Sequence, residues 1–295
     1  MLKQGSEILE IEARFPVSPG YEYRTTVKKM WSGKCLGAWF LEIWDFRDLF
    51  YFLVWRDIKV RYKQTVLGAL WAVIQPFFTM ILLTAFFGKI AGIGTEDTPY
   101  PILSYCALVP WAYFSGALSS CANSMVSNSS LFTKIYFPRI AVPVSAVAAG
   151  LIDFAIASLL LLALIPYYNV PITLAVIFWP ILAMPLFVLV LGLGIIMASL
   201  SVRYRDVKYA LPFVNQLMML ATPIIYPLAV VPVSYRWLSI FNPLTGIIEA
   251  FRAIVLKPNS VDFFSLGVSL VETVAIFGFG LVYFRKTERV IADVI

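Results

Sequence analysis

The sequence has 295 residues, of which 60% are apolar and 14% are charged, with a formal net charge of +6. Soluble domains carry about 25% charged residues, so this composition excludes an ordinary soluble domain and favours a membrane protein. Histidine is absent, which excludes Ser-His and Cys-His nucleophile systems and the usual zinc ligands. No GxxxxGKS/T phosphate loop occurs either, so no catalytic residue and no metal site is predicted.

Residues 1–42 are polar and irregular, and we interpret them as a cytoplasmic arm without a cleavable signal peptide. Residues 43–63 form a predicted helix in the membrane interface. Trp55 and Tyr62 share one face of this helix and are predicted to face lipid. The basic residues beside them suit anionic phosphates, so a membrane surface is a better partner than nucleic acid.

Six apolar stretches can cross a hydrocarbon core of about 30 Å. The predicted transmembrane domain covers 64–285, with spans at 67–87, 102–125, 140–165, 172–200, 209–231 and 263–284. Residues 232–259, between the last two spans, are predicted to form extracytoplasmic re-entrant half-helices broken at Asn242-Pro243. Residues 286–295 form a charged tail. The predicted fold class is therefore an all-α polytopic membrane protein.

The lysines and arginines set the orientation of these spans. Of the 23, 19 lie in the N-terminal stretch, in the loops after spans two and four, and in the tail, and 4 lie in the opposite loops. Because positive loops stay in the cytoplasm, both termini are predicted to be cytoplasmic.

Several segments occur in an order seen in one family: RDIKVRYKQTVLGALWAVIQPFF, LFTKIYFPRIAVPVS, SVRYRDVKYALPF, TPIIYP, NPLTGIIEAFR and YFRKTERVIADVI. From about residue 40 onward the chain resembles the permease subunit of type-2 ABC exporters of O-antigen, capsular polysaccharide and teichoic acid, found in the bacterial inner membrane. The resemblance implies a homodimer joined to two ATP-binding cassette subunits. ATP and Mg²⁺ would bind to those subunits, and this chain would bind no cofactor. The implied substrate is an undecaprenyl-linked polysaccharide.

The resemblance also implies that the loop after span two is a coupling helix seated in a cleft of the ATP-binding subunit. A Leu-Phe pair in a short polar loop favours such a partner, although a solvated positive loop is the alternative. The matching residues are Ser129, Ser130, Leu131, Phe132, Thr133, Lys134, Tyr136 and Arg139.

Two basic clusters have implied roles at the cytoplasmic side. The first, on the interfacial helix, could receive the pyrophosphate of the lipid-linked substrate or could only anchor the helix to the membrane; it comprises Arg56, Lys59, Arg61 and Lys63. The second could form a cytoplasmic gate or an ion pair that caps two helices; it comprises Arg203, Arg205 and Asp206.

Asp153 and Glu272 lie near the middle of predicted spans, where carboxylates are costly and usually functional. They could bond sugar hydroxyls in a channel, couple transport to protons, or be protonated acids bonded to a neighbouring helix. Proton coupling defines the alternative function, a proton-coupled secondary transporter. A lipid-processing enzyme is disfavoured, because the sequence offers no acidic metal cluster and no paired loop carboxylates.

Two further sets of side chains belong to the membrane domain. Glu249 and Arg252, three residues apart on a half-helix, are predicted to form an ion pair on the outer side. Five aromatic residues could stack against sugars along a glycan path, or face lipid as most membrane aromatics do: Trp71, Phe77, Phe78, Phe213 and Tyr226.

Overall fold

The computed structural model describes residues 46–63, 65–90, 98–132 and 137–294, so the predicted arm and the first residues of the interfacial helix lie outside the described residues. The described residues form helices and no strand, which confirms the all-α prediction. Within these described residues, five helical stretches are long and apolar enough to cross a membrane: Gly68–Ile90, Tyr100–Ser127, Ala141–Tyr167, Leu174–Arg203 and Phe263–Glu288. Helices satisfy their own backbone groups, as lipid requires.

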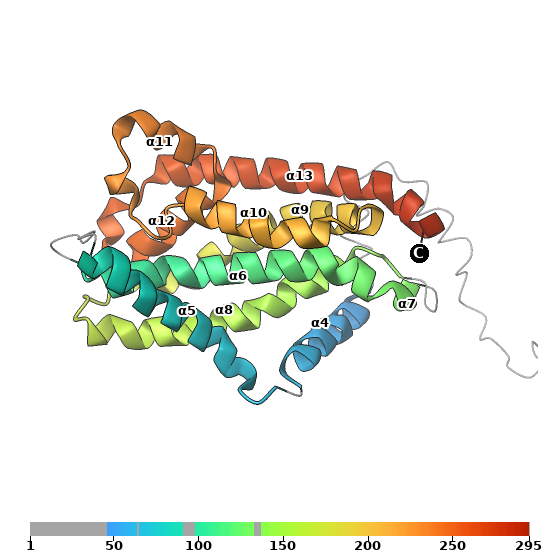
Figure 1. Cartoon of the computed structure of the whole chain (residues 1–295), viewed down its shortest axis with the longest axis horizontal. Helices are drawn as coiled ribbons and strands as arrows, with labels where there is room; N and C mark the ends of the chain where they lie inside the picture. Colours follow the sequence, from blue (N-terminus) through green and yellow to red (C-terminus); the bar gives the residue numbers. More distant parts are fainter. Residues whose placement is uncertain (1–45, 64, 91–97, 133–136, 295) are drawn as a thin grey trace, which may run out of the picture. The chain divides into compact units, whose positions relative to one another are not determined.

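Helix α6 (Tyr100–Ser127) is the centre of the bundle. It packs against α8 (Ala141–Tyr167) and α9 (Trp179–Arg203), and the three run side by side in Figure 1. In an apolar 18-residue window of α6, 78% of the window is buried, whereas in the corresponding window of Gly68–Ile90 only 11% is buried. The core therefore lies around α6, and the first apolar stretch lies at the edge, where lipid or another chain must cover it.

Helices α9 and α13 (Phe263–Val294) approach each other at two glycines. A Cβ atom on Gly192 would lie 2.8 Å from the Cα atom of Phe277, and one on Gly280 would lie 2.6 Å from the carbonyl oxygen of Gly192. The two backbones can meet this closely only because neither position carries a side chain. Small residues at helix contacts are how apolar helices pack in lipid, where the hydrophobic effect does not hold them together.

The segment predicted to be re-entrant forms two short helices, α11 (Val233–Ile240) and α12 (Pro243–Leu256). The break falls at Asn242, whose side-chain oxygen accepts a hydrogen bond from the backbone N–H of Leu244. Helix α12 packs against α6, α9 and α13, and Phe251 on it contacts Trp179 of α9 at a ring-centroid distance of 4.6 Å. The two-helix break is confirmed, while the depth of these helices in a membrane remains a prediction.

The fifth predicted span differs from the structure. Helix α10 (Val207–Ala221) has 15 residues and ends well before the predicted limit of 231. Thr222 adopts an extended conformation (φ −96°, ψ 141°) because it precedes Pro223, whose ring disfavours helix in the residue before it. At about 1.5 Å per residue, α10 spans roughly 22 Å, less than a bilayer core. A continuous fifth helix across the membrane is therefore not confirmed.

The remaining elements lie around this bundle. Helix α4 (Arg47–Tyr62) is followed by a tight turn that begins at Gly68. The positive φ of 48° at this position favours glycine. Helix α5 (Trp71–Leu83) and a π-helical stretch, Thr84–Ile90, come next. Figure 1 shows α4 and α5 meeting at this turn as an elbow beneath α6 and α8. Helix α7 (Ser129–Phe132) follows α6, and α13 extends past the predicted span end at 284 into the tail.

Candidate functional site

Helix α4 is fastened to α8 by two polar links. The hydroxyl of Ser145 donates to Oδ2 of Asp57 at 2.9 Å. Two turns further along α8, the carboxylate of Asp153 forms an ion pair with Arg61 and accepts a hydrogen bond from the hydroxyl of Tyr62. Asp57 and Arg61 are four residues apart and lie on one face of α4, and Ser145 and Asp153 are eight residues apart and lie on one face of α8. These two faces contact each other.

A third helix joins the link at Asp153. The guanidinium of Arg61 also donates to the hydroxyl of Ser120 on α6 at 3.2 Å. The side chains of Arg61 and Asp153 are each 29% exposed, so the pair is partly shielded from water. Burial, and then the hydrogen bond to Asp153, raises the pKa of Tyr62 above its ordinary value. Tyr62 therefore stays a neutral donor to the carboxylate.

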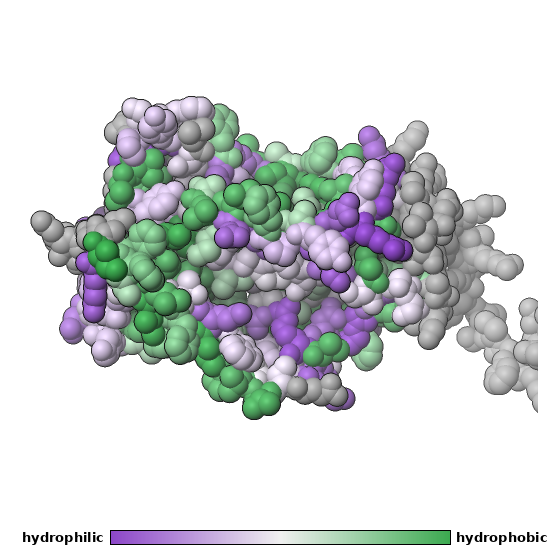
Figure 2. Space-filling view, in the orientation of Figure 1, coloured by the Kyte–Doolittle hydropathy of each residue, from purple (hydrophilic) through white to green (hydrophobic). Residues whose placement is uncertain are grey.

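A cleft of about 300 Å³ opens beside this cluster, between the α4–α5 elbow and helices α6 and α8. Figure 2 shows hydrophilic surface over α4, next to the apolar surface of α5. Besides the charged pair and Tyr62, the polar side chains that line the cleft include Thr65, Gln75 and Ser120. The indole of Trp71, which is 50% exposed, forms part of the wall.

The residues of the cleft define what it can do chemically. Hydroxyl, amide and charged groups around an aromatic wall suit a polar ligand that carries hydroxyls or a phosphate. No group of three potential metal ligands occurs in the part of the chain that the structure describes. The side chains that line the cleft can bind and orient a ligand, and they include no histidine or cysteine nucleophile.

The four basic residues predicted on the interfacial helix fall into two groups. Arg56 pairs with Asp57 at 2.7 Å and Arg61 pairs with Asp153, so both are held by carboxylates. Lys59 and Lys63 are exposed, and the Nζ of Lys59 lies 5.5 Å from the centroid of the Trp55 ring. The prediction that Tyr62 faces lipid is wrong, because its hydroxyl is bonded to a carboxylate of the bundle.

The predicted cytoplasmic gate residues are exposed and do not meet one another. The guanidinium of Arg203 lies over the ring of Tyr204, 5.4 Å from its centroid. Asp206 precedes α10 but makes no capping hydrogen bond with its side chain. No ion pair among the described residues includes Arg203, Arg205 or Asp206. The interpretation that an ion pair between them caps two helices is therefore wrong.

The predicted coupling residues are partly described. Ser129, Ser130, Leu131 and Phe132 make up α7, whereas Thr133, Lys134 and Tyr136 lie outside the described residues. The ring of Phe132 stacks on that of Phe137 with centroids 5.6 Å apart, and Leu131 is half-buried. The guanidinium of Arg139 donates to the carbonyl of Glu288 at 2.8 Å, which joins this loop to α13.

The intramembrane candidates are spread over the molecule. Asp153 and Trp71 lie at the cleft, while Phe78 and Phe213 are exposed on α5 and α10, with 59% and 62% of their surface accessible. Phe77 packs edge-on against Phe78, and the hydroxyl of Tyr226 donates to the carbonyl of Leu220.

Glu272 on α13 has a buried carboxylate oxygen without a hydrogen-bond partner among the described residues. At this oxygen Glu272 therefore lacks the hydrogen bond to a neighbouring helix that is expected of a protonated acid with a structural role. The predicted pair of Glu249 and Arg252 is confirmed at 2.6 Å.

Sequence reasoning missed Asp57, Ser120 and Ser145 as parts of the site. The available signal was the matched spacing of Asp57 and Arg61 on one helix and of Ser145 and Asp153 on another. That signal becomes informative only when the two helices are known to be neighbours.

Comparison with known proteins identifies the family. The family model described as ABC-2 type transporter matches residues 48–256, well over half of the chain. This chain therefore belongs to the ABC-2 type transporter family, and it is a multi-pass membrane protein. The match begins within α4 and runs through α12, so it covers every residue that lines the cleft.

Three relatives are informative. The chain is 29% identical to the O-antigen export system permease protein RfbA of Myxococcus xanthus, over 75% of this chain and 85% of the relative. It is 26% identical to a Klebsiella pneumoniae protein of the same name (84% and 95%) and 24% identical to the polysialic acid transport protein KpsM of Escherichia coli (79% and 91%). This family supports an ABC permease and gives no support to the proton-coupled alternative.

Proposed function

We propose that this chain is the permease subunit of an ATP-driven exporter that moves an undecaprenyl-linked polysaccharide across the bacterial inner membrane. The observation that carries the proposal is the family match over residues 48–256, together with relatives named for O-antigen export and polysialic acid transport. The polysaccharide class of the substrate is inferred from those names, which belong to proteins aligned to this chain over 85% to 95% of their own length.

In the proposed arrangement two copies of the chain form the channel, and the chain crosses the membrane six times with both termini in the cytoplasm. The distribution of 19 of 23 basic residues supports this orientation. Helix α10 and the extended segment after it together make the fifth crossing, and α11 and α12 form the re-entrant pair. The apolar faces of α5 and α10 support a dimer, because side chains such as Phe78, Tyr209 and Phe213 are largely exposed in one copy.

ATP and Mg²⁺ are proposed to bind to two separate ATP-binding cassette subunits and not to this chain. The loop from Ser129 to Arg139 would contact that subunit through Leu131 and Phe132. The bond from Arg139 to the backbone of α13 supports this role, because a displacement of the loop would be passed directly to a membrane-spanning helix.

The α4 surface and its cleft are proposed to receive the head of the lipid-linked substrate. Lys59 and Lys63 carry charges that no carboxylate of the described residues neutralises, so they are suited to attract the pyrophosphate. The cleft at Arg61, Asp153 and Trp71 offers hydroxyl-binding groups and a stacking wall for the first sugar. Arg203 and Arg205 remain candidates for a gate as individual exposed charges.

Deletion of the gene in its host tests the proposal. We expect undecaprenyl-linked glycan to accumulate on the cytoplasmic side and the exported polymer to disappear, with both effects reversed by a plasmid copy. If the deletion strain still exports the polymer at the normal level, this chain serves another substrate.

A further inference from the structure

Helix α10 ends in a buried stretch of chain that leaves backbone carbonyls without helical partners. Thr222 and Ile224 are fully buried, and the segment from Thr222 to Pro227 is not helical. The last carbonyls of a helix have no intrahelical donor, and Pro223 contributes no N–H to supply one. In apolar surroundings each unpaired carbonyl is costly, so donors must come from elsewhere in the chain.

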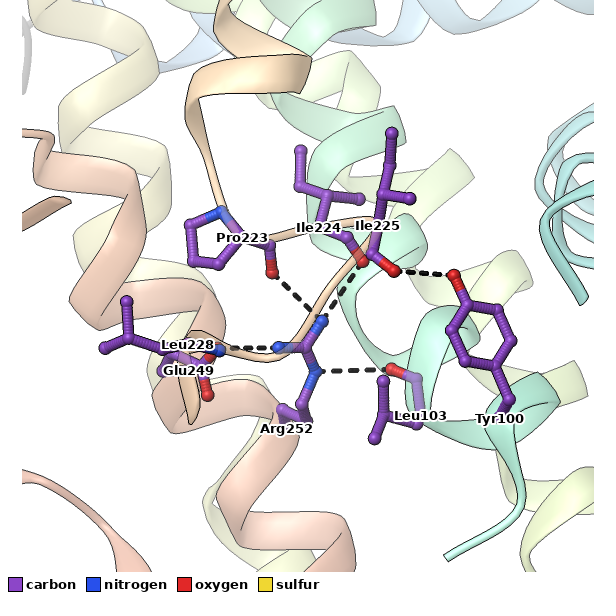
Figure 3. A network of polar contacts seen from close by, with 8 residues as sticks. All are labelled: Tyr100, Leu103, Pro223, Ile224, Ile225, Leu228, Glu249 and Arg252. Carbon is purple, nitrogen blue, oxygen red and sulfur yellow. Dashed lines mark hydrogen bonds and ion pairs between the residues drawn. The ribbon is translucent and has the colours of Figure 1, made fainter. Parts of the chain in front are cut away.

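Arg252 on α12 supplies these donors (Figure 3). One terminal nitrogen of its guanidinium donates to the carbonyls of Pro223 and Ile224 at 3.0 and 3.1 Å. The Nε atom donates to the carbonyl of Leu103 on α6 at 3.3 Å, and the other terminal nitrogen pairs with Glu249 at 2.6 Å. Arg252 is only 4% exposed, so a full positive charge is enclosed by three carbonyls and one carboxylate.

Neighbouring groups complete the enclosure. The hydroxyl of Tyr100 donates to the carbonyl of Ile225 at 2.5 Å, and Glu249 also accepts from the backbone N–H of Leu228 at 3.2 Å. The side-chain amide of Asn242 donates to the hydroxyl of Thr222 at 2.8 Å. The segment after α10 is thus held at successive positions by α6 and α12.

We propose that Arg252 is the resident cation of a carbonyl cage at the break after α10. In transporters with discontinuous helices, unwound carbonyls and helix C-termini coordinate Na⁺ or protons. Here the guanidinium of the chain itself occupies that position, so the cage takes no inorganic ion. Arg252 is a positioning residue: it joins the end of α10 to α12 and α6, and a displacement of α10 therefore displaces α12. This inference does not depend on the identity of the exported substrate.

The geometry requires a guanidinium and not merely a positive charge. The partners lie in different directions, and Arg252 reaches them with separate nitrogens arranged in a rigid planar fork. A lysine ammonium carries its three donors on one atom and cannot reach the carbonyl on α6 and both carbonyls after α10 together. Lysine at this position should therefore leave part of the cage unbonded.

Chemical rescue in the purified full-length chain tests the proposal. The thermal unfolding midpoint is measured in detergent for the wild type, Arg252→Ala and Arg252→Lys, with and without methylguanidinium. We expect both variants to unfold at lower temperature than the wild type. Methylguanidinium should raise the midpoint of Arg252→Ala saturably, by about 3 °C or more, because it binds the folded state only. KCl, NaCl and tetramethylammonium chloride at the same ionic strength should not.

Arg236→Ala is the matched control, since Arg236 lies on α11 outside the cage, and its midpoint should not respond to methylguanidinium. Equal rescue by Na⁺ or K⁺, or no rescue by methylguanidinium, would overturn the proposal. If Arg252→Ala cannot be purified, Arg252→Lys decides: a midpoint several degrees below the wild type supports the cage, and a midpoint equal to the wild type refutes it.

Discussion

Arg61 at the end of α4 and Asp153 in the middle of α8 form an ion pair although 92 residues separate them in the sequence. The pair fixes α4 against α8, and the bond from Arg61 to Ser120 joins both to the core helix α6. Because the pair also lines the cleft, a ligand that bound there would act on the same contact that holds α4 in place. Binding at the cleft and the position of α4 are therefore linked.

The first prediction concerns this pair. Asp153→Asn and Arg61→Gln should each lower the stability of the folded chain by about 1–3 kcal/mol, because each leaves a partly shielded charge without its partner. The double replacement Arg61→Asp/Asp153→Arg should recover part of the loss. The measurement is the thermal unfolding midpoint of the purified chain.

Asp48→Asn provides the control for the first prediction, since the side chains of Arg47 and Asp48 are 65% and 98% exposed and their ion pair is 3.8 Å long. It should shift the midpoint by less than the experimental error. Equal effects of Asp48→Asn and Asp153→Asn would mean that the Arg61–Asp153 pair contributes nothing specific.

The second prediction concerns pH. The pKa of Tyr62 is raised in the folded chain, first by burial and then by its bond to Asp153, while the unfolded chain releases this proton near pH 10. The contribution of Tyr62 is therefore fully present below about pH 10 and is lost as the pH rises above that value. The stability difference between wild type and Tyr62→Phe should be about 1 kcal/mol at pH 8 and should shrink between pH 10 and 11. A difference that stays constant over this range would contradict the assignment.

The third prediction concerns the contact of α9 with α13. Gly192→Ala and Gly280→Ala should each destabilise the chain by about 1–3 kcal/mol, because the added methyl group would overlap backbone atoms of the other helix. Gly278→Ala, on the same helix as Gly280, meets no atom within 4 Å and should be neutral. Midpoints of the three variants in one detergent are sufficient, and three equal values would contradict the close approach.

The fourth prediction concerns the coupling loop. Leu131→Asp/Phe132→Asp should abolish retention of the ATP-binding subunit on affinity-tagged permease, because charges replace the apolar side chains proposed to enter its cleft. As a control, Ser127→Asp places a single negative charge on the exposed end of α6 and should retain the subunit. Retention by the double variant, with the chain still folded, would refute the contact.

Most of this fold could be predicted from the sequence, because most of its helices are determined by residues close to one another in the chain. The helices Tyr100–Ser127 and Ala141–Tyr167 follow long apolar runs, and the pair of Glu249 and Arg252 follows from a spacing of three on one helix. The end of α10 was not predicted, although Pro223 is a local signal for it, because the apolar sequence from Thr222 to Pro227 also fits a membrane span. The donors that hold this segment after the break, Arg252 and Tyr100, lie far from it in the sequence. The orientation of Tyr62 was misjudged for the same reason: its partner, Asp153, lies 91 residues away.

Transport by purified components tests the central proposal most directly. Proteoliposomes containing this chain and its ATP-binding subunit are given undecaprenyl-linked polysaccharide and Mg²⁺, and polymer appearing on the far side is measured. We expect translocation that requires ATP and the ATP-binding subunit and that continues when the proton gradient is collapsed. Translocation by the permease alone, driven by a proton gradient without ATP, would contradict the account.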